Sequence, residues 1–396
     1  MASPPRFRVL VLNEISPNGL KRLPSENYTT GKDLADPDAI LVRSADMHTM
    51  DLPASVKAVG RAGAGTNNIP VKAMSARGVP VFNAPGANAN AVKELVLAGM
   101  LIAARNLAPA QRFVENLDPS VPDLEKAVED GKKNFAGYEL AGQTLGIVGL
   151  GKIGCLVADA AIKLGMNVLG YDPEITVDAA WSLPSQVKKA ASVADVLKNA
   201  HFISLHVPLV EATRELVNEK NVKLTREGAV LLNFSREGVV SDAAVLSALG
   251  NGQLGWYVCD FPSGNILKHP KVVALPHLGA STREAEENCA IMVADQMRDY
   301  LENGNIVNAV NFPNVTMARE SRFRVAIANA NVPNMLGQIS TAMAQAGLNI
   351  HNMVNKSRGD MAYTLVDVDS AVGDGVIAAL KAIDGVLAVR YLPQAD

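Results

Sequence analysis

The run GLGKIG at residues 149–154 constrains the fold of this chain more than any other feature. An apolar stretch, Thr144–Val148, precedes it, and a helical pattern over 153–164 overlaps its end. In such a run Gly149 permits a tight turn, Gly151 lets the backbone approach a phosphate group, and Gly154 lets the helix pack close to the sheet. The run therefore predicts a strand–turn–helix unit that holds the pyrophosphate of a dinucleotide at the helix N-terminus.

An acidic side chain stands where a dinucleotide-binding unit needs one. Asp172 lies eighteen residues after Gly154, next to the apolar stretch Asn167–Tyr171. A carboxylate here accepts hydrogen bonds from the adenosine ribose and repels a 2′-phosphate, so the sequence predicts NAD rather than NADP as the cofactor. The alternative is an ordinary turn aspartate before Pro173.

Composition excludes several classes of protein. The chain has 396 residues, 48% of them hydrophobic, which is enough for two or three domains, and its net charge is −3. It has no basic run and no stretch of about 18 apolar residues, so we expect neither a nucleic-acid nor a membrane partner. Residues 1–5 carry no apolar signal-peptide segment, and the three cysteines are expected to be buried free thiols, so we expect a cytoplasmic protein. We predict no metal site.

Short apolar stretches alternate with helical or turn-rich segments along most of the chain. Before the glycine run they lie at Phe7–Leu12, Ala39–Val42, 58–60 and Val81–Phe82, and a long helical pattern covers 89–107. After Asp172 they lie at Phe202–Leu205, 230–233, 256–259 and Val272–Ala274, with a helical segment at 242–249. This alternation is typical of parallel sheets with helices on their faces, and it predicts a doubly wound nucleotide domain over 137–276.

The pattern changes after a long predicted helix at 281–303 and a linker-like segment at 307–313. The order is then strand, helix, strand, strand, helix, strand, at 324–328, Met335–Gln345, 349–356, 362–369, 374–383 and 386–391. This βαββαβ order over about 75 residues predicts a separate, ferredoxin-like domain.

Three strand ends beyond the glycine run carry polar residues in apolar surroundings, at 233–236, 259–260 and 276–280. Open α/β sheets bind ligands at the carboxyl ends of their strands, so we expect these positions near the nicotinamide. The planar guanidinium of Arg236 suits a substrate carboxylate, and His277 suits proton exchange with a hydroxyl group near neutral pH. Each alone would more often be structural; together they predict hydride transfer between a hydroxy acid and NAD.

These motifs together resemble the D-2-hydroxyacid dehydrogenase family. The likeness rests on GLGKIG, Asp172, HVPL (206–209), NFSR (233–236), Asp260 and PHLGAST (276–282). LVRS (41–44), GRAGAGTNNIP (60–70) and NAPGANANAV (83–92) resemble the substrate domain of such enzymes. NANVPNMLGQIS (329–340), GLNIHNMVNKSRGD (347–360) and AYTLVDVD (362–369) resemble an ACT domain. The resemblance covers nearly the whole chain.

The resemblance implies a domain organisation and an activity. A discontinuous substrate-binding domain would comprise 1–90 and 282–312, an NAD-binding Rossmann domain 91–281, and an ACT regulatory domain 320–396. The first two would be doubly wound Rossmann- or flavodoxin-like α/β domains. The implied activity is NAD-dependent oxidation of 3-phospho-D-glycerate to 3-phosphooxypyruvate, the first step of L-serine biosynthesis, in a homodimer or homotetramer.

The resemblance also implies a role for each matching residue. The cofactor-binding residues would be Gly149, Gly151, Lys152, Ile153, Gly154, Asp172, His206, Val207, Pro208, Thr213, Asn233, Ser235, Asp260, Gly279 and Ala280. The two anionic ends of the substrate need more than one cation and a nest of backbone N–H groups. The matching substrate-binding residues are Arg43, Ser44, Arg61, Gly63 and Ala64. Lys133, or its neighbour Lys132, would contact the phosphate from a neighbouring subunit or would be an ordinary surface lysine.

One position in the catalytic set departs from the family pattern. Most members have a glutamate five residues after the aspartate that corresponds to Asp260, and this glutamate pairs with the catalytic histidine. Asn265 stands at that position in this chain. An amide can orient the ring of His277 but supplies no charge to stabilise its protonated form. Four interpretations stay open: a nearby acid takes over, the position that matches the glutamate is offset by a residue or two, His277 is less basic than in relatives, or catalysis is lost.

The C-terminal unit also departs slightly from the pattern of ACT domains. Asn331 and Asn349 match the positions that bind serine in regulated relatives, which makes L-serine the candidate effector. Asn334 stands where many ACT domains have a glycine, and asparagine tolerates a positive φ. The alternative is that this unit only dimerises the chain through its sheet edge.

Two other functions remain open on the sequence. One is oxidation of another D-2-hydroxy acid, such as 2-hydroxyglutarate, which would not need Arg43 and Arg61 for a phosphate. The other is a non-catalytic regulator that binds NAD and an amino acid, and the amide at Asn265 is what motivates it.

Overall fold

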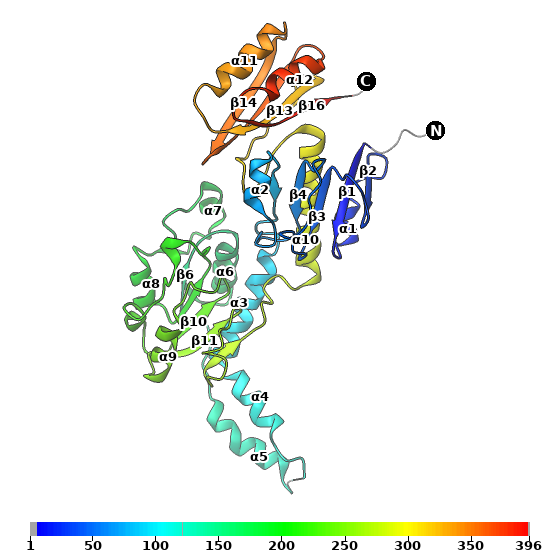
Figure 1. Cartoon of the computed structure of the whole chain (residues 1–396). Coiled ribbons are helices and arrows are strands. Elements are labelled where there is room, and N and C mark those ends of the chain that lie inside the picture. Colours follow the sequence, from blue (N-terminus) through cyan, green and yellow to red (C-terminus); the bar gives the residue numbers. More distant parts are fainter. Residues whose placement is uncertain (1–5, 121, 395–396) are drawn as a thin grey trace. The chain divides into compact units, whose positions relative to one another are not determined.

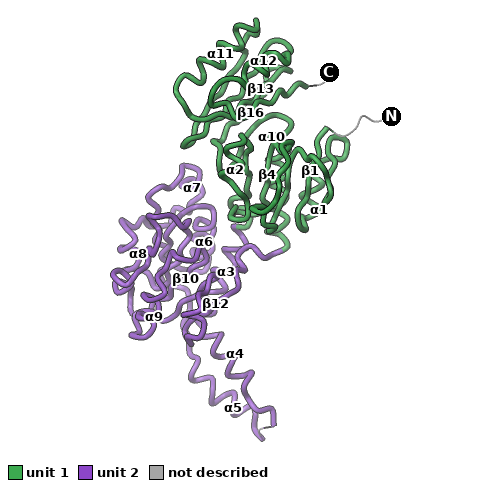
Figure 2. The backbone as a smooth tube through the Cα atoms, in the orientation of Figure 1, with its two compact units in different colours: residues 1–88, 283–396 green, residues 89–282 purple. Residues whose placement is uncertain are grey.

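The computed structural model describes residues 6–120 and 122–394, and the chain forms two compact units (Figure 2). Unit 1 comprises residues 1–88 and 283–396, and unit 2 comprises residues 89–282. Residues 1–5, to which the signal-peptide expectation refers, lie outside the described residues. No helix within the described ranges is long and apolar enough to span a membrane. The three cysteines are buried free thiols, as predicted.

Unit 2 is built on one parallel sheet, of which Figure 1 labels β6, β10 and β11. The strand order is β12-β11-β10-β9-β6-β7-β8. The strands are Thr144–Val148 (β6), Asn167–Tyr171 (β7), Lys188–Lys189 (β8), Phe202–Leu205 (β9), Ala229–Asn233 (β10), Leu254–Cys259 (β11) and Val272–Ala274 (β12). β6 pairs with β7 on one side and with β9 on the other. The strand order therefore reverses at β6, and such sheets bind ligands beyond the carboxyl ends of the strands at this point.

Alternate residues of the central strands face two separate cores. In β10, Val230 and Leu232 pack with α3 (Ala89–Ala104) and α6 (Lys152–Lys163), whereas Leu231 packs with α8 (Val193–Asn199) and α9 (Asp242–Gly250). Because both faces are buried, these strands are short continuous apolar runs rather than alternating ones. The other helical elements of this unit are α4 (Leu107–Glu115), α5 (Leu124–Gly131), η1 (Lys132–Phe135), α7 (Val177–Ser182), η2 (Glu211–Thr213) and η3 (Val222–Leu224).

The predicted helix over 89–107 is wrong at its carboxyl end. α3 ends at Ala104, Asn106 turns the chain with a φ of 50°, and α4 begins at Leu107. The side-chain amide of Asn106 donates to the carbonyl of Ala136 at 3.0 Å, which helps to offset the cost of the left-handed backbone. The apolar pattern continues across this turn, so the sequence does not reveal it.

Unit 1 contains a second parallel sheet, with the order β2-β1-β3-β4-β5. Its elements are β1 (Phe7–Leu12), α1 (Pro17–Leu20), β2 (Tyr28–Gly31), β3 (Ala39–Val42), β4 (Ala58–Arg61), α2 (Val71–Ala76) and β5 (Val81–Phe82). The sequence does not predict β2, because the exposed Thr29 and Thr30 of this edge strand interrupt the apolar pattern. The strand order reverses between β1 and β3, which creates a second ligand-binding point of the same kind. The predicted parallel α/β architecture is confirmed.

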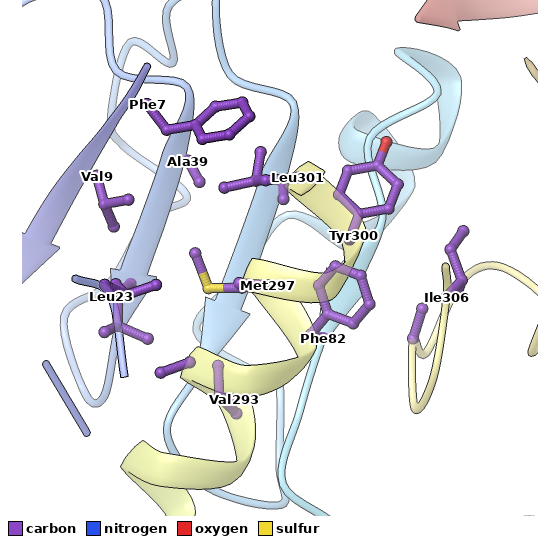
Figure 3. Packing of buried hydrophobic residues seen from close by; sticks show 14 of the residues in the cluster. Phe7, Val9, Leu23, Ala39, Phe82, Val293, Met297, Tyr300, Leu301 and Ile306 are labelled. Atoms are coloured by element: carbon purple, nitrogen blue, oxygen red, sulfur yellow. The ribbon is translucent and has the colours of Figure 1, made fainter. Parts of the chain in front are cut away.

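Helix α10 (Arg283–Asn303) runs through the main core of unit 1 (Figure 3). Val293, Met297 and Leu301 lie at i, i+4 and i+8 and therefore share the face that packs on the sheet. Gly60 of β4 permits this close approach, since a Cβ there would lie 2.1 Å from the sulfur of Met297.

The end of the chain forms an antiparallel sheet with the order β14-β15-β13-β16. Its elements are β13 (Phe323–Ala330), α11 (Met335–Gln345), β14 (Ile350–Arg358), β15 (Met361–Val368), α12 (Asp374–Lys381) and β16 (Val386–Pro393). The predicted βαββαβ order is confirmed. One face of the sheet packs on α11 and α12 through residues such as Ile327, and the other face joins the α10 core through Tyr363 and Leu392.

The segment predicted as a linker, 307–313, belongs to this core, so that prediction is wrong. Ala309 and Phe312 are buried, and Ala309 forms an antiparallel bridge to Phe82 of β5. The ring of Phe312 also contacts Tyr363 of β15, with 6.4 Å between centroids. The segment is therefore packed between the two sheets of unit 1, which its short apolar sequence does not reveal.

A fully buried arginine joins the C-terminal sheet to the end of α10. Arg324 of β13 forms a bidentate ion pair with Asp367 of β15, at 2.6 and 2.8 Å. Its other N–H groups donate to the carbonyls of Asn303, Met317 and Ala318. All five guanidinium N–H groups have an acceptor, which is what a charge without exposed surface requires.

Two further side chains bind carbonyls at the end of α10. Arg390 of β16 donates to Tyr300 and Leu301 at 3.0 and 2.8 Å and lies over the ring of Tyr300. Tyr363 of β15 donates to the carbonyl of Gly304 at 2.7 Å. The last carbonyls of a helix lack intrahelical partners, and a cation there interacts favourably with the helix dipole. The C-terminal sheet therefore caps α10.

We expect Asp367→Ala to lower the free energy of unfolding by about 3–5 kcal/mol, because it leaves the buried Arg324 guanidinium without its counter-ion. Asp159→Ala removes an exposed ion pair with Lys163 on α6 and should cost less than about 1 kcal/mol. Urea denaturation followed by circular dichroism measures both variants. Equal effects would show that the buried pair does not anchor the C-terminal sheet.

Candidate functional site

The glycine run forms the turn between β6 and α6, as predicted. Gly149 has a φ of 94°, and a Cβ there would lie 2.3 Å from the carbonyl oxygen of His206. A Cβ at Gly154 would lie 2.1 Å from the carbonyl oxygen of Gly149. The packing of the protein itself therefore requires these two glycines.

Gly151 is the glycine that leaves room for a ligand. It is the N-cap of α6, and a Cβ there would meet no protein atom within 4 Å. Lys152 and Ile153 form the first turn of this 12-residue helix, whose N–H groups and dipole favour an anion. The turn fits the pyrophosphate of a dinucleotide, because Gly149 and Gly154 allow its tight backbone and Gly151 leaves space for the ligand.

Asp172 follows β7 and is bound to the same turn. Its Oδ2 accepts the N–H of Leu150 at 2.8 Å, and its Oδ1 accepts the N–H of Glu174 at 2.9 Å. These bonds orient the carboxylate beside the glycine run, while each oxygen can accept a further hydrogen bond. This geometry suits the predicted role of Asp172 on the ribose hydroxyls.

Residues 206–213 form the loop after β9, on the other side of β6. The N–H of His206 donates to the carbonyl of Val148 at 2.7 Å, and its ring Nε2 lies 2.9 Å from Ser204 Oγ. Burial lowers the pKa of the His206 imidazole to about 4, so the ring is neutral at pH 7. Thr213 closes the loop by donating its hydroxyl to the carbonyl of Pro208 at 2.5 Å.

Asn233, the last residue of β10, organises the loop that carries Arg236. Its Oδ1 accepts the hydroxyl of Ser235 at 2.8 Å, and its Nδ2 donates to the carbonyl of Arg236 at 3.0 Å. Nη1 of Arg236 donates to the carbonyl of Ser235 at 2.6 Å, and the residue is exposed. A buried amide therefore fixes the backbone at Arg236, whose side chain is exposed at the carboxyl end of β10.

The buried carboxylate of Asp260 fixes the loop that carries His277. Asp260 follows β11 and is 1% exposed, and its two oxygens accept the N–H groups of Leu278 and Gly279 at 2.7 and 2.8 Å. Its backbone carbonyl accepts the N–H of His277 at 3.1 Å. Hydrogen bonds to a carboxylate are strong because they are charge-assisted. The loop from His277 to Ala280, beyond β12, is thus held by the neighbouring strand end.

His277 has a left-handed φ of 55°, which is uncommon for a residue with a Cβ. Such strain persists only where the surroundings enforce it, and it clusters at functional sites. The exposed imidazole contacts the ring of Phe261, with 4.5 Å between centroids. Asn265 is also exposed, and among the described residues no hydrogen bond joins it to His277. The ring contact comes from Phe261, a residue that the sequence did not single out.

In unit 1, a hydrogen bond joins Arg61 to Arg43. Nε of Arg61 donates to the carbonyl of Arg43 at 3.0 Å, and Nη2 of Arg43 pairs with Glu286 of α10 at 2.5 Å. The N–H of Ser44 donates to Asn13 Oδ1 at 3.0 Å. Sequence reasoning missed Glu286, because it lies far along the chain and no local pattern links it to Arg43.

The loop that carries the predicted nest of amides contains a sharp turn at Gly63. The N–H of Gly63 donates to the carbonyl of Arg61 at 2.7 Å, so a sharp turn uses this amide inside the loop. The carbonyl of Ala64 accepts the side-chain amide of Asn83 at 2.6 Å. The roles of Gly63 and Ala64 toward a substrate anion stay predictions.

The remaining predicted residues lie on the surface of each unit. Lys133 lies on η1, with its Nζ 3.6 Å from a carboxylate oxygen of Asp130. Asn331 is exposed and binds the turn between β14 and β15, and Asn349 is exposed at the start of β14. Asn334 has a φ of 63°, which agrees with the positive φ expected there. The roles of Lys133, Asn331 and Asn349 toward a partner subunit or an effector stay predictions.

Comparisons with known proteins agree with this geometry. Residues 97–279 match the family model described as D-isomer specific 2-hydroxyacid dehydrogenase, NAD binding domain. A D-3-phosphoglycerate dehydrogenase of Haemophilus influenzae is 32% identical over 350 residues, which cover 85% of this chain and 81% of that protein. The chain belongs to the D-2-hydroxyacid dehydrogenase family. Its cofactor is NAD, as predicted, because the matched model is the NAD-binding domain of this family.

Two further relatives extend the comparison. A D-3-phosphoglycerate dehydrogenase of Methanocaldococcus jannaschii is 34% identical over 325 residues, which cover 80% of this chain and 59% of that protein. The chain thus spans about three fifths of the length of that relative. The crystal structure of the TT0316 protein from Thermus thermophilus superposes with a TM-score of 0.62 at 26% identity, covering 76% of this chain and 99% of that one.

We expect Gly151→Ala to fold normally but to bind NADH at least about tenfold more weakly, because its methyl group meets no protein atom yet occupies the space left for the pyrophosphate. Gly154→Ala should instead lower the midpoint of thermal unfolding, since its methyl group clashes with the carbonyl of Gly149. Energy transfer from tryptophan to NADH measures binding, and thermal denaturation measures stability. Unchanged NADH affinity in Gly151→Ala would contradict the assignment.

Proposed function

We propose that this chain catalyses the NAD-dependent oxidation of 3-phospho-D-glycerate to 3-phosphooxypyruvate, the first step of L-serine biosynthesis. The observation that carries the proposal is the arrangement at the carboxyl edge of the unit 2 sheet. Arg236 after β10 and His277 after β12 lie on the same edge as the glycine turn after β6. The names of the Haemophilus and Methanocaldococcus relatives support this substrate.

Two side chains of unit 2 have roles in the reaction. Bound NAD would supply the acceptor for the hydride that leaves the carbon bearing the substrate hydroxyl. Arg236 would bind the substrate carboxylate, since the Ser235 carbonyl already orients its guanidinium fork. His277 would accept the hydroxyl proton during oxidation and return it during reduction. The hydrogen bonds to Asp260 fix the backbone that carries the imidazole, and a general base needs a well-placed backbone.

A phosphorylated substrate also needs cations for its second anionic end. We assign this role to Arg43 and Arg61 of unit 1, because a guanidinium presents its donors in a fork that matches phosphate. The alternative substrate is another D-2-hydroxy acid, such as 2-hydroxyglutarate, whose far end is a carboxylate. Replacing these arginines separates the two candidate substrates. If the substrate is phosphorylated, the variants should lose the preference for phosphorylated substrates.

Regulation and assembly belong to the same proposal. The βαββαβ unit has the topology of an ACT domain, and the exposed amides of Asn331 and Asn349 offer donors and acceptors to an amino acid, with L-serine as the proposed effector. The proposed assembly is a homodimer or homotetramer in which Lys133 contacts the phosphate in a neighbouring subunit.

The second candidate function is a non-catalytic regulator, which Asn265 in place of the usual glutamate favours.

The chain should consume NADH faster with 3-phosphooxypyruvate than with 2-oxoglutarate or hydroxypyruvate, measured by NADH absorbance with and without L-serine. His277→Ala should lower kcat by about 10²–10⁴-fold, because it removes the proton donor. His269→Gln, at a histidine between β11 and β12, is the matched control and should leave the rate unchanged. Preference for 2-oxoglutarate would support the alternative substrate. Bound NADH without turnover of any keto acid would support the regulator.

Asn265→Glu should extend keto-acid reduction to higher pH by about one unit. A carboxylate near His277 favours the protonated imidazole, which is the form that donates the proton, so the rate would fall at a higher pH than in the natural chain. The pH dependence of kcat/KM measures this shift, with Asn265→Gln as the uncharged control. Superimposable profiles of the three proteins would show that position 265 does not act on His277.

A further inference from the structure

A cavity of about 280 Å³ lies in unit 1 at the carboxyl ends of three parallel strands. Residues 14–17 after β1, Arg43 after β3 and Ala62 after β4 line it, together with Arg283 and Glu286 from the start of α10. β1 and β3 are the neighbouring strands between which the order of the sheet reverses, and open α/β sheets bind ligands at such points. The volume is just below the range of roughly 300–1,000 Å³ typical of ligand pockets, so it suits a small group.

Two carboxylates and two guanidiniums line this cavity. Glu286 pairs with Arg43 at 2.5 Å, and Glu14 pairs with Lys32 at 2.7 Å, so each carboxylate already has a cation. Arg283 is exposed where it lines the cavity, and within the described residues its side chain forms no ion pair or hydrogen bond. One guanidinium in the cavity therefore has no counter-ion in the described part of the chain.

We propose that Arg283 is a specificity-determining residue of the substrate site and binds the substrate phosphate together with Arg43. The inference rests on the proposed function and extends it to a residue outside the motifs that the family resemblance covers. A guanidinium donates two parallel N–H groups to phosphate oxygens, and Arg43 has donors left beside the one that binds Glu286.

The charge balance favours phosphate over carboxylate at this end of the substrate. Glu286 offsets the charge of Arg43, so Arg43 with Glu286 offers donors to an anion but little net charge. Arg283 supplies a positive charge that no ion pair in the described residues engages, and a phosphate dianion interacts with it more strongly than a carboxylate does. Removal of Arg283 should therefore affect phosphorylated substrates selectively.

Arg283→Gln should raise KM for 3-phosphooxypyruvate at least about tenfold and leave kcat within about twofold, because it removes a charge-assisted contact outside the reacting atoms. The KM for hydroxypyruvate, which lacks the phosphate, should stay unchanged. Arg283→Lys should recover part of the loss, since it restores the charge without the fork. Arg112→Gln, at an exposed arginine on α4, is the matched control.

Calorimetric titration of inorganic phosphate into the natural chain and into Arg283→Gln tests the same contact without turnover. Weaker phosphate binding by the variant supports the inference, even if the natural chain prefers another hydroxy acid and the proposed function fails. Equal phosphate affinities, or an unchanged KM for 3-phosphooxypyruvate in an active variant, would overturn the inference while the proposed function stands. Equal increases in KM for both keto acids would also overturn it, because the contact would not depend on phosphate.

Discussion

Interactions at the carboxyl end of helix α10 join the parts of unit 1. Its carbonyl groups lack intrahelical partners, and Arg324, Tyr363 and Arg390 of the C-terminal sheet bind them or their neighbour Gly304. At its other end the same helix brings Glu286 to Arg43. The C-terminal sheet, the helix and the cavity at the carboxyl edge of the parallel sheet therefore share one framework, in which the terminal sheet is a packed part of unit 1.

Buried carboxylates have a similar task in both units. Asp367 holds Arg324 in unit 1, and Asp260 holds the backbone of the His277 loop in unit 2. A buried charge is costly unless its hydrogen bonds are satisfied, so each site tolerates few arrangements of the groups around it. In unit 2 this requirement supports the left-handed backbone of His277, and it links the proposed general base to the end of the adjacent strand.

The nucleotide turn could be predicted in detail because its determinants are local. Gly149, Gly151 and Gly154 act within one strand–turn–helix unit, and their spacing alone indicates which glycine turns the chain and which leaves room for phosphate. Other features depend on contacts that the local pattern does not carry. The break at Asn106 is stabilised by the carbonyl of Ala136, and the burial of Phe312 depends on a strand that comes later in the chain.

The sequence by itself determined the α/β class, the glycine turn with Asp172, and Arg236 and His277 as the candidate catalytic pair, because these follow from residue type and short spacing. Only the tertiary structure decided the partners: Glu286 for Arg43, Phe261 for the ring of His277, and the end of α10 for the C-terminal sheet. The physical reason is that satisfying a charge or a helix end requires a group at the right place in space, and such a group can come from anywhere in the chain.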